Sequence, residues 1–158
     1  MKKLIIIRHG KATQSFMPDK ERFLVDKGKK RTQKFALKLK ETGIIPDLIL
    51  TSPAVRAKQT AEIIAEVFSF PKDKIQEKDT FYFRGKELVY NELYALPDDK
   101  NAVFIVGHNP LWTELADNFS TKQILHLRTS GIFGVEFDTK HWTEIETAEK
   151  RDLVLISD

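Results

Sequence analysis

Residues 4–10 read LIIIRHG, and this stretch decides the fold. Its four apolar residues, three of them β-branched, are typical of a strand buried on both faces of a sheet. The strand then stops at Arg8, His9 and Gly10. An Arg beside a His at the mouth of a buried strand is costly to place, so the segment predicts an anion site there. The alternative is a strand that merely surfaces, with Arg8 in solvent and Gly10 in a turn.

The composition is that of a globular protein. The chain has 158 residues, of which 41% are apolar and 31% charged, and this suits one domain over residues 1–158. It contains no cysteine, which excludes disulfides, thiolate metal sites and a cysteine nucleophile. No apolar run has the length of a membrane span, and the apolar run after Met-Lys-Lys is too short for the core of a signal peptide. We therefore expect a cytoplasmic protein that does not bind membranes.

The charge is mildly basic, with a formal net charge of +3. Its densest basic run extends from Lys27 to Lys40 at helical spacing. Such a run is typical of a solvated outer helix face, and the alternative is a surface for an acidic partner or nucleic acid. Aromatic residues do not alternate with these lysines as they do in single-strand binders, so we expect no nucleic-acid partner.

Strand-like and helix-like segments alternate along the chain. The predicted strands cover 4–8, 48–51, 74–77, 102–106, 132–138 and 153–157. The predicted helices cover 26–42, 52–68, 86–96 and 109–119, with Ser52-Pro53 and Asn109-Pro110 as cap-plus-proline starts. This alternation predicts a single three-layer α/β/α domain with a mostly parallel central sheet. The last two strands have no helix between them, so that part of the sheet is expected to be antiparallel.

Polar clusters follow three of the predicted strands. The first strand ends at 8–10, the second at 51–53 with Arg56 one turn into the next helix, and the fourth at 107–110. Ligands of parallel α/β sheets bind beyond the carboxyl ends of the strands. We therefore expect two arginines and two histidines to converge beside two helix N-termini.

Such a cluster suits a phosphoryl group. Arginine forks pair with phosphate oxygens, and helix N-termini add backbone donors. A histidine among cations has its protonated form disfavoured, so His9 is expected to be neutral and nucleophilic. Arg8, Arg56 and His108 are expected to supply positive charge for phosphoryl transfer. No carboxylate–histidine pattern indicates a metal, and no GxxxxGK[ST] loop is present, so we expect no cofactor.

Each of these residues also has an ordinary structural interpretation. Arg56 alone is typical of a surface helix, and His108 alone of a helix cap or a core. Only their joint placement favours a site. His126 and His141 have no such context and are interpreted as structural.

Three motifs carry a family resemblance. RHG at 8–10, SPAVRAKQTA at 52–61 and VGHNP at 106–110 resemble the motifs of the histidine phosphatase superfamily, which includes the phosphoglycerate-mutase-like enzymes. The small size of the chain and the residues of the second and third motifs are similar to those of the compact SixA-type phosphohistidine phosphatases. The resemblance implies a phosphoglycerate-mutase-like fold and a metal-independent reaction in which His9 becomes phosphorylated.

The resemblance also assigns site residues. It implies catalytic roles for His9, Arg8, Arg56 and His108. It implies substrate-binding positions at Gly10, Ser52, Asn109, Thr129 and Ser130.

The general acid of larger relatives lies in an insertion that this chain lacks. Residues 79–82 resemble the segment in which relatives often carry an acidic residue, and the carboxylates considered are Asp79, Glu77 and Glu87. Val25 stands where many relatives have a capping Ser or Thr, and Asp26 is expected to take over that cap.

The resemblance implies hydrolysis of phosphohistidine on a phosphorylated partner protein. The first alternative is a phosphatase for small phosphorylated substrates. The alternative of another class is a non-catalytic phosphate-binding or protein-interaction module. A mutase is disfavoured because it needs a closed site that keeps water away.

Overall fold

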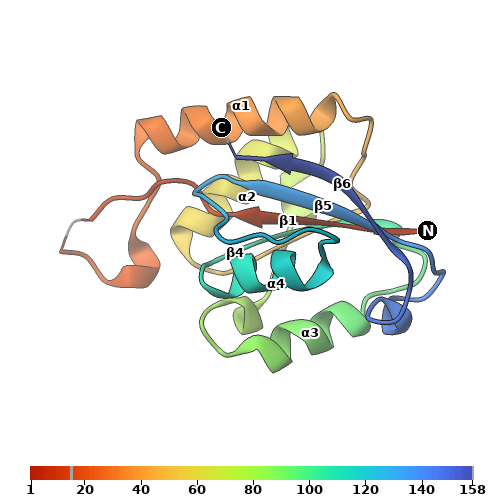
Figure 1. The fold of residues 1–158 in the computed structure, drawn as a ribbon. Coiled ribbons are helices and arrows are strands. Elements are labelled where there is room, and N and C mark those ends of the chain that lie inside the picture. Colours follow the sequence, from red (N-terminus) through yellow and green to blue (C-terminus); the bar gives the residue numbers. More distant parts are fainter. Residues whose placement is uncertain (15, 158) are drawn as a thin grey trace.

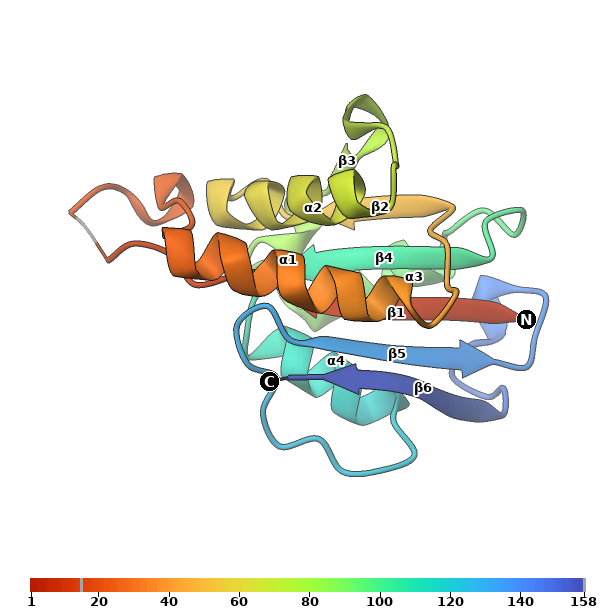
Figure 2. The same ribbon diagram turned by 90° about the horizontal axis from the view of Figure 1, so that it is seen from above.

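A six-stranded sheet lies between two layers of helices in the computed structural model, which describes residues 1–14 and 16–157 (Figure 1, Figure 2). The strands are β1 (Lys2–Arg8), β2 (Leu48–Thr51), β3 (Gln76–Glu77), β4 (Ala102–Gly107), β5 (Ile132–Phe137) and β6 (Lys150–Ile156). The helices are α1 (Asp26–Lys40), α2 (Val55–Val67), α3 (Lys86–Tyr94) and α4 (Leu111–Phe119). Short 3-10 turns are η1 (Asp19–Glu21), η2 (Lys72–Lys74), η3 (Asp79–Phe81) and η4 (Trp142–Glu144). The predicted three-layer α/β/α architecture is confirmed.

The sheet has the order β3-β2-β4-β1-β5-β6. The first four strands of that order are parallel, whereas β5 runs antiparallel to both β1 and β6. The carboxyl ends of β1, β2 and β4 therefore share one edge, which we call the polar edge. Because β5 runs the other way, its start meets this edge, and Ile132 pairs with Ile7. The loop before β5 is thereby brought to the polar edge as well.

Strand β1 is buried on both faces, as its sequence predicts. Leu4 and Ile6 pack into the core on the side of α3 and α4, and Ile5 and Ile7 pack into the core on the side of α1 and α2. All four side chains are fully buried. The alternation follows from the strand period of two, which sends successive side chains to opposite faces. The central strand thus joins both halves of the core and delivers Arg8 and His9 to the polar edge.

Helix α2 begins later than predicted, and the interpretation of Ser52 as its cap is wrong. The helix starts at Val55, with Ala54 in the N-cap position. The Ser52 hydroxyl instead accepts the Ala54 N–H at 3.2 Å and lies 2.8 Å from Nε2 of His108. A hydroxyl engaged in a turn and with a buried histidine is not available to cap a helix.

Two other helix starts also differ from the predictions. Helix α4 begins at Leu111 rather than at the Asn109-Pro110 pair, although Asn109 Oδ1 accepts the Thr113 N–H at 3.1 Å. Asp26 is the first residue of α1, and Val25 holds the N-cap position without a side-chain hydrogen bond. Asp26 therefore does not cap α1, although a carboxylate in the first turn still favours the helix dipole.

No helix among the described residues has the length and apolar character that crossing a membrane requires.

Candidate active site

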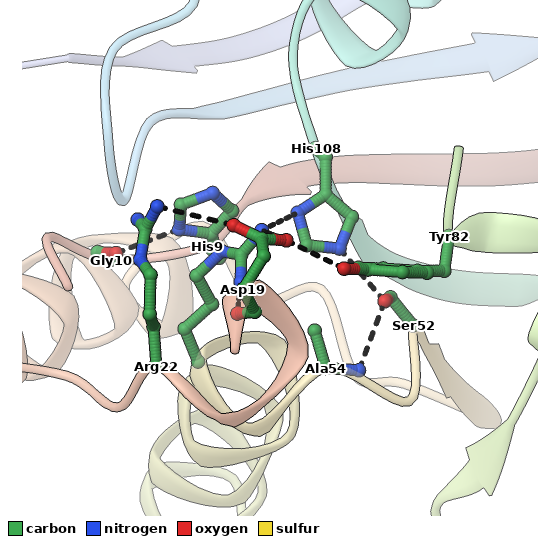
Figure 3. A network of polar contacts seen from close by, with 9 residues as sticks. His9, Gly10, Asp19, Arg22, Ser52, Ala54, Tyr82 and His108 are labelled. Atoms are coloured by element: carbon green, nitrogen blue, oxygen red, sulfur yellow. Dashed lines mark hydrogen bonds and ion pairs between the residues drawn. The ribbon is translucent and has the colours of Figure 1, made fainter. Parts of the chain in front are cut away.

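His9 lies at the end of β1, 8% exposed. Its Nδ1 is 2.7 Å from the carbonyl oxygen of Gly10 (Figure 3). Because a carbonyl only accepts, Nδ1 carries the proton and Nε2 keeps its lone pair. Burial first, and then the charges of Arg56 and Arg8, lower the pKa of His9 from 6.5 to about 4. At neutral pH His9 is therefore an uncharged imidazole with a nucleophilic Nε2.

The backbone around His9 is held from three sides. Its N–H donates to the Gly107 carbonyl at 3.1 Å, and its carbonyl accepts the Ser130 N–H at 3.1 Å. The next N–H, that of Gly10, donates to Thr60 Oγ1 at 2.9 Å. Strand β4, helix α2 and the loop before β5 thus fix the nucleophile together.

Gly10 and Ser130 pack against each other behind His9. A Cβ at Gly10 would lie 2.8 Å from Thr32 Oγ1 and 3.1 Å from Ser130 Oγ, so only glycine fits without displacement. The hydroxyls of Thr32 and Ser130 are themselves hydrogen-bonded at 2.8 Å. The predicted substrate-binding residues Gly10 and Ser130 therefore have contacts that position His9, and Thr129 lies half-buried in the same loop.

His108 follows β4 and is 2% exposed. Its Nδ1 is 3.4 Å from Nη2 of Arg56 and its Nε2 is 2.8 Å from Ser52 Oγ. Because a guanidinium only donates, Nδ1 accepts and the Nε2 proton is directed at Ser52. Burial, followed by the charges of His9 and Arg56, lowers the pKa of His108 to about 3. His108 was expected to supply positive charge, but at this pKa its ring is neutral and the arginines carry that charge.

Three arginines supply buried donors at the site. Arg56, on the first turn of α2, is 3% exposed, and Arg8 ends β1. Arg22, which the sequence did not single out, also acts on the pKa of His9. In the part of the chain that the structure describes, the Nε atoms of all three are buried without a hydrogen-bond partner. Buried donors normally find partners, so this cluster fits the oxygens of an anion.

Asn109 and Arg8 donate hydrogen bonds to the same backbone oxygen in the loop before β5. Asn109 Nδ2 donates to the Leu127 carbonyl at 2.8 Å, and Arg8 Nη1 donates to the same oxygen at 3.1 Å. Asn109, predicted to bind substrate, thus shares an acceptor with Arg8 at the polar edge.

An aspartate that the sequence analysis missed lies among these groups. Asp19 Oδ2 is 3.1 Å from Nη2 of Arg56 and accepts the hydroxyl of Tyr82 at 2.6 Å (Figure 3). Asp19 Oδ1 is 3.2 Å from Nη1 of Arg22. The hydrogen bond from Tyr82, together with Arg56, lowers the pKa of Asp19, so its carboxylate is ionised at neutral pH. The only sequence signal was the i, i+3 spacing of Asp19 and Arg22 after a proline.

The carboxylates considered from the sequence have other partners. Asp79 forms an ion pair with Arg84 at 2.9 Å, and Glu77 forms one with Lys58 at 2.8 Å. Glu87 is exposed in the first turn of α3. The structure thus brings Asp19, rather than these three, to the arginines.

An α/β fold in which a histidine and arginines gather at the carboxyl edge of parallel strands belongs to a class of protein suited to binding a phosphoryl group, and comparison with known proteins gives the family. The model of the histidine phosphatase superfamily (branch 1) matches residues 4–82. An uncharacterized protein of Picosynechococcus sp. is 35% identical over 139 residues, covering 84% of this chain and 83% of that protein. The chain belongs to the histidine phosphatase superfamily, whose members act as phosphatases.

Solved structures place it in the SixA-type branch. The protein histidine phosphatase SixA, complexed with tungstate, matches with a TM-score of 0.82 and 25% identity over 98% of this chain and 96% of that one. A SixA structure from Agrobacterium tumefaciens shares the fold at a TM-score of 0.82 and 22% identity, covering 99% of this chain and 98% of that one. The mitochondrial serine/threonine-protein phosphatase Pgam5 of Drosophila ananassae is 33% identical over 72 residues, 46% of this chain but 25% of that protein. The phosphoglycerate-mutase-like fold is confirmed.

Proposed function

We propose that this protein hydrolyses phosphohistidine carried by a partner protein, and that Nε2 of His9 accepts the phosphoryl group. One observation carries the proposal: a neutral His9, whose Nδ1 is bound to the Gly10 carbonyl, lies among three arginines with buried unpartnered Nε atoms. The 25% identity to a structure named as a protein histidine phosphatase supports the substrate class.

The reaction proceeds in two transfers. In the first, the Nε2 lone pair of His9 bonds to phosphorus and the P–N bond of the substrate breaks. Its electron pair stays on the departing nitrogen, so a substrate ring that is protonated on its other nitrogen leaves as neutral imidazole. Arg8, Arg56 and Arg22 face the charge on the equatorial oxygens, which is the main task of a protein in phosphoryl transfer. In the second, a water oxygen bonds to the phosphorus of phospho-His9, the P–Nε2 bond breaks with its electron pair returning to Nε2, and the protons of the water leave with the phosphate. Because the arginines supply the charge, we infer that no metal takes part.

The ionised Asp19 bears on the choice of substrate. As a carboxylate it accepts hydrogen bonds from Tyr82 and Arg56 and has no proton to give to a leaving group. General acid catalysis is typically worth ~10²–10⁴-fold, so poor leaving groups lose most by its absence. An imidazole departs far more easily than an alkyl alkoxide. The site therefore favours phosphohistidine over sugar phosphates or phosphoglycerate.

The covalent intermediate is the first test. Rapid acid-free quenching of the wild type with a phosphorylated substrate should trap a base-stable, acid-labile phosphoprotein. His9→Ala should abolish both the trapped species and turnover, because it removes the ring whose Nε2 lone pair attacks phosphorus. His126→Ala, at an exposed position on the loop before β5, is the matched control and should behave as the wild type. Substantial turnover by His9→Ala would overturn the proposed function.

Leaving-group dependence is the second test. Across phosphate esters of graded leaving-group pKa, we expect kcat/KM to fall steeply as that pKa rises, with aryl phosphates at the favoured end. Phosphohistidine, a phosphoramidate, is measured beside the series and should react as readily as the aryl phosphates. Single-turnover rates should show the same trend, which establishes that chemistry is being measured. A flat series would reveal an efficient acid in the site, and Asp19 would be the first residue to replace in the search for it.

A further inference from the structure

We propose that Phe83, braced by Tyr82, binds the aromatic ring of the leaving group and so selects phosphorylated rings over phosphorylated alkyl groups. This inference rests on the proposed function and adds a specificity-determining residue to that site. The motifs assign no role to Phe83. The proposal stands on ring contacts, backbone conformation and exposure.

The first observation is a row of rings that ends at Phe83. The centroids of the His9 and His108 rings are 5.0 Å apart, and those of His108 and Phe83 are 4.8 Å apart with planes inclined by 35°. His108 is 2% exposed, whereas Phe83 is 58% exposed. Phe83 therefore lies between the buried histidine pair and solvent, at the opening of the site.

The second observation is the backbone of Phe83. Its φ is 52°, in the left-handed region that bulky residues rarely adopt. A residue held in that region has an unfavourable local conformation that its surroundings must compensate, and such residues cluster at functional sites. Here the conformation directs an apolar ring onto His108 while most of that ring stays exposed.

The third observation is that the neighbouring ring is fixed by the phosphate-binding groups. Tyr82 lies edge-on to His108, with centroids 5.5 Å apart, and its ring contacts that of Phe83 at 5.0 Å. Its hydroxyl donates to Asp19, which also pairs with Arg56. Tyr82, and Phe83 in contact with it, are thus held in place through Asp19 by Arg56, the arginine that would bind the phosphoryl oxygens.

The position of this pair indicates what it binds. In-line transfer places the leaving group on the side of phosphorus opposite the nucleophile, which here is the side away from His9. A planar imidazole or phenyl ring in that position can pack on the exposed face of Phe83. Contact between two aromatic rings raises affinity roughly two- to tenfold beyond the effect of the surface area that it buries. A methyl group or a hydroxylated chain gains no such contact.

The test uses two non-hydrolysable probes, phenylphosphonate and methylphosphonate, titrated calorimetrically. The wild type should bind phenylphosphonate more tightly, and Phe83→Ala should reduce that preference roughly two- to tenfold while affinity for methylphosphonate changes little. Phe83→Tyr keeps an aromatic ring and should keep the preference. Ile45→Ala removes another exposed apolar side chain, in the segment leading into β2 at the opposite edge of the sheet, and is the control.

Three outcomes would overturn the inference: no preference in the wild type, an unchanged preference in Phe83→Ala, or an equal loss of affinity for both probes. An equal loss of affinity for both probes would mean that Phe83 only packs on His108 and makes no contact with the leaving group. Because the readout is binding, the inference and the proposed function fail separately. A wild type that never turns over phosphohistidine refutes the function, and the ratio of the two affinities still decides the role of Phe83.

Discussion

Arg56 contacts two different residues of the site at once. Its Nη1 donates to the Asp19 carbonyl at 2.7 Å, and its Nη2 lies 3.1 Å from the Asp19 carboxylate and 3.4 Å from Nδ1 of His108. A guanidinium is a planar fork with several fixed donors, whereas an ammonium is a compact point charge. The tautomer of His108 and the place of Asp19 therefore both depend on this one side chain.

The substitution Arg56→Lys tests that dependence. We expect it to lower kcat/KM by well over tenfold, more than ~1.4 kcal/mol of transition-state stabilisation, because lysine keeps the charge but loses the fork. Steady-state kinetics with an aryl phosphate measure the loss. Arg151→Lys, at an exposed arginine of β6 that pairs with the buried Glu136 far from the polar edge, is the control and should stay within about twofold of the wild type. Near-wild-type kinetics for Arg56→Lys would mean that the fork is not used.

At this scale the sequence predicts the site residues that belong to its motifs but misses Asp19 and the hydrogen bond that it accepts from Tyr82. His9 and His108 follow buried strands and Arg56 follows on the first turn of α2, so their convergence follows from the strand pattern. Asp19 and Tyr82 belong to loop segments 63 positions apart, and their hydrogen bond depends on how both segments fold over the sheet. Ser52 was misread for a related reason, because the pattern of a helix cap does not reveal that a histidine competes for the hydroxyl.

At the scale of elements, helix α1 is fitted to the loop that carries the nucleophile. Gly28 in its first turn packs directly on Lys11, so that a Cβ there would lie 2.3 Å from the Lys11 carbonyl oxygen. The chain just before α1 is held to α2 as well, because the Leu24 N–H donates to Gln59 Oε1 at 2.7 Å. The close approach at Gly28 lets α1 support the backbone that follows His9.

We expect Gly28→Ala to destabilise the protein, although alanine is the better helix former by ~1 kcal/mol. Forcing a methyl group into packed backbone typically costs ~1–3 kcal/mol, and backbone atoms yield less readily than the end of a flexible side chain. Urea unfolding measures the change in the free energy of unfolding. The neighbouring exposed substitution Lys27→Ala should leave that free energy unchanged or raise it slightly. A Gly28→Ala variant as stable as the wild type would show that α1 can move away from Lys11 at no cost.

The start of strand β6 was not predicted from the sequence. The apolar run predicts a strand at 153–157, but β6 begins at Lys150. Its first residues, Lys150 to Asp152, pair with Phe137 to Val135 of β5. The pairing of β6 with β5 is made by backbone hydrogen bonds. Because β6 is an edge strand, the side chains at its start can be polar, and no apolar pattern marks these residues as a strand.

At the scale of the whole molecule, the mixed sheet assembles one site from four distant segments. Parallel β1, β2 and β4 deliver their carboxyl ends to the polar edge, and antiparallel β5 delivers its start there. The strand–helix alternation predicts the shared carboxyl edge of β1, β2 and β4, because parallel strands share that edge, but it does not predict the strand order that brings the start of β5 there. The consequence is that two buried neutral histidines lie at the junction of both core halves, and their ionisation is linked to folding of the entire sheet.

This linkage predicts how acid affects stability. The folded-state pKa values of about 4 for His9 and about 3 for His108 lie below the ordinary value of 6.5. The unfolded chain therefore binds protons that the folded one rejects. The stability that goes with neutral histidines is fully present above pH ~6.5 and is lost as the pH falls toward about 4 for His9 and about 3 for His108. Each such histidine adds up to ~1.4 kcal/mol per pH unit to the slope of the unfolding free energy in that window.

Replacing one histidine isolates its share of that slope. Across the window below pH ~6.5, His9→Asn should reduce the slope by up to ~1.4 kcal/mol per pH unit, because asparagine does not titrate. Loss of the contact with Gly10 shifts the whole curve without changing its slope, so the two effects separate in urea unfolding at a series of pH values. If His9→Asn retains the wild-type slope, His9 is not held neutral by the fold, and its readiness as a nucleophile would have to come from the bound substrate.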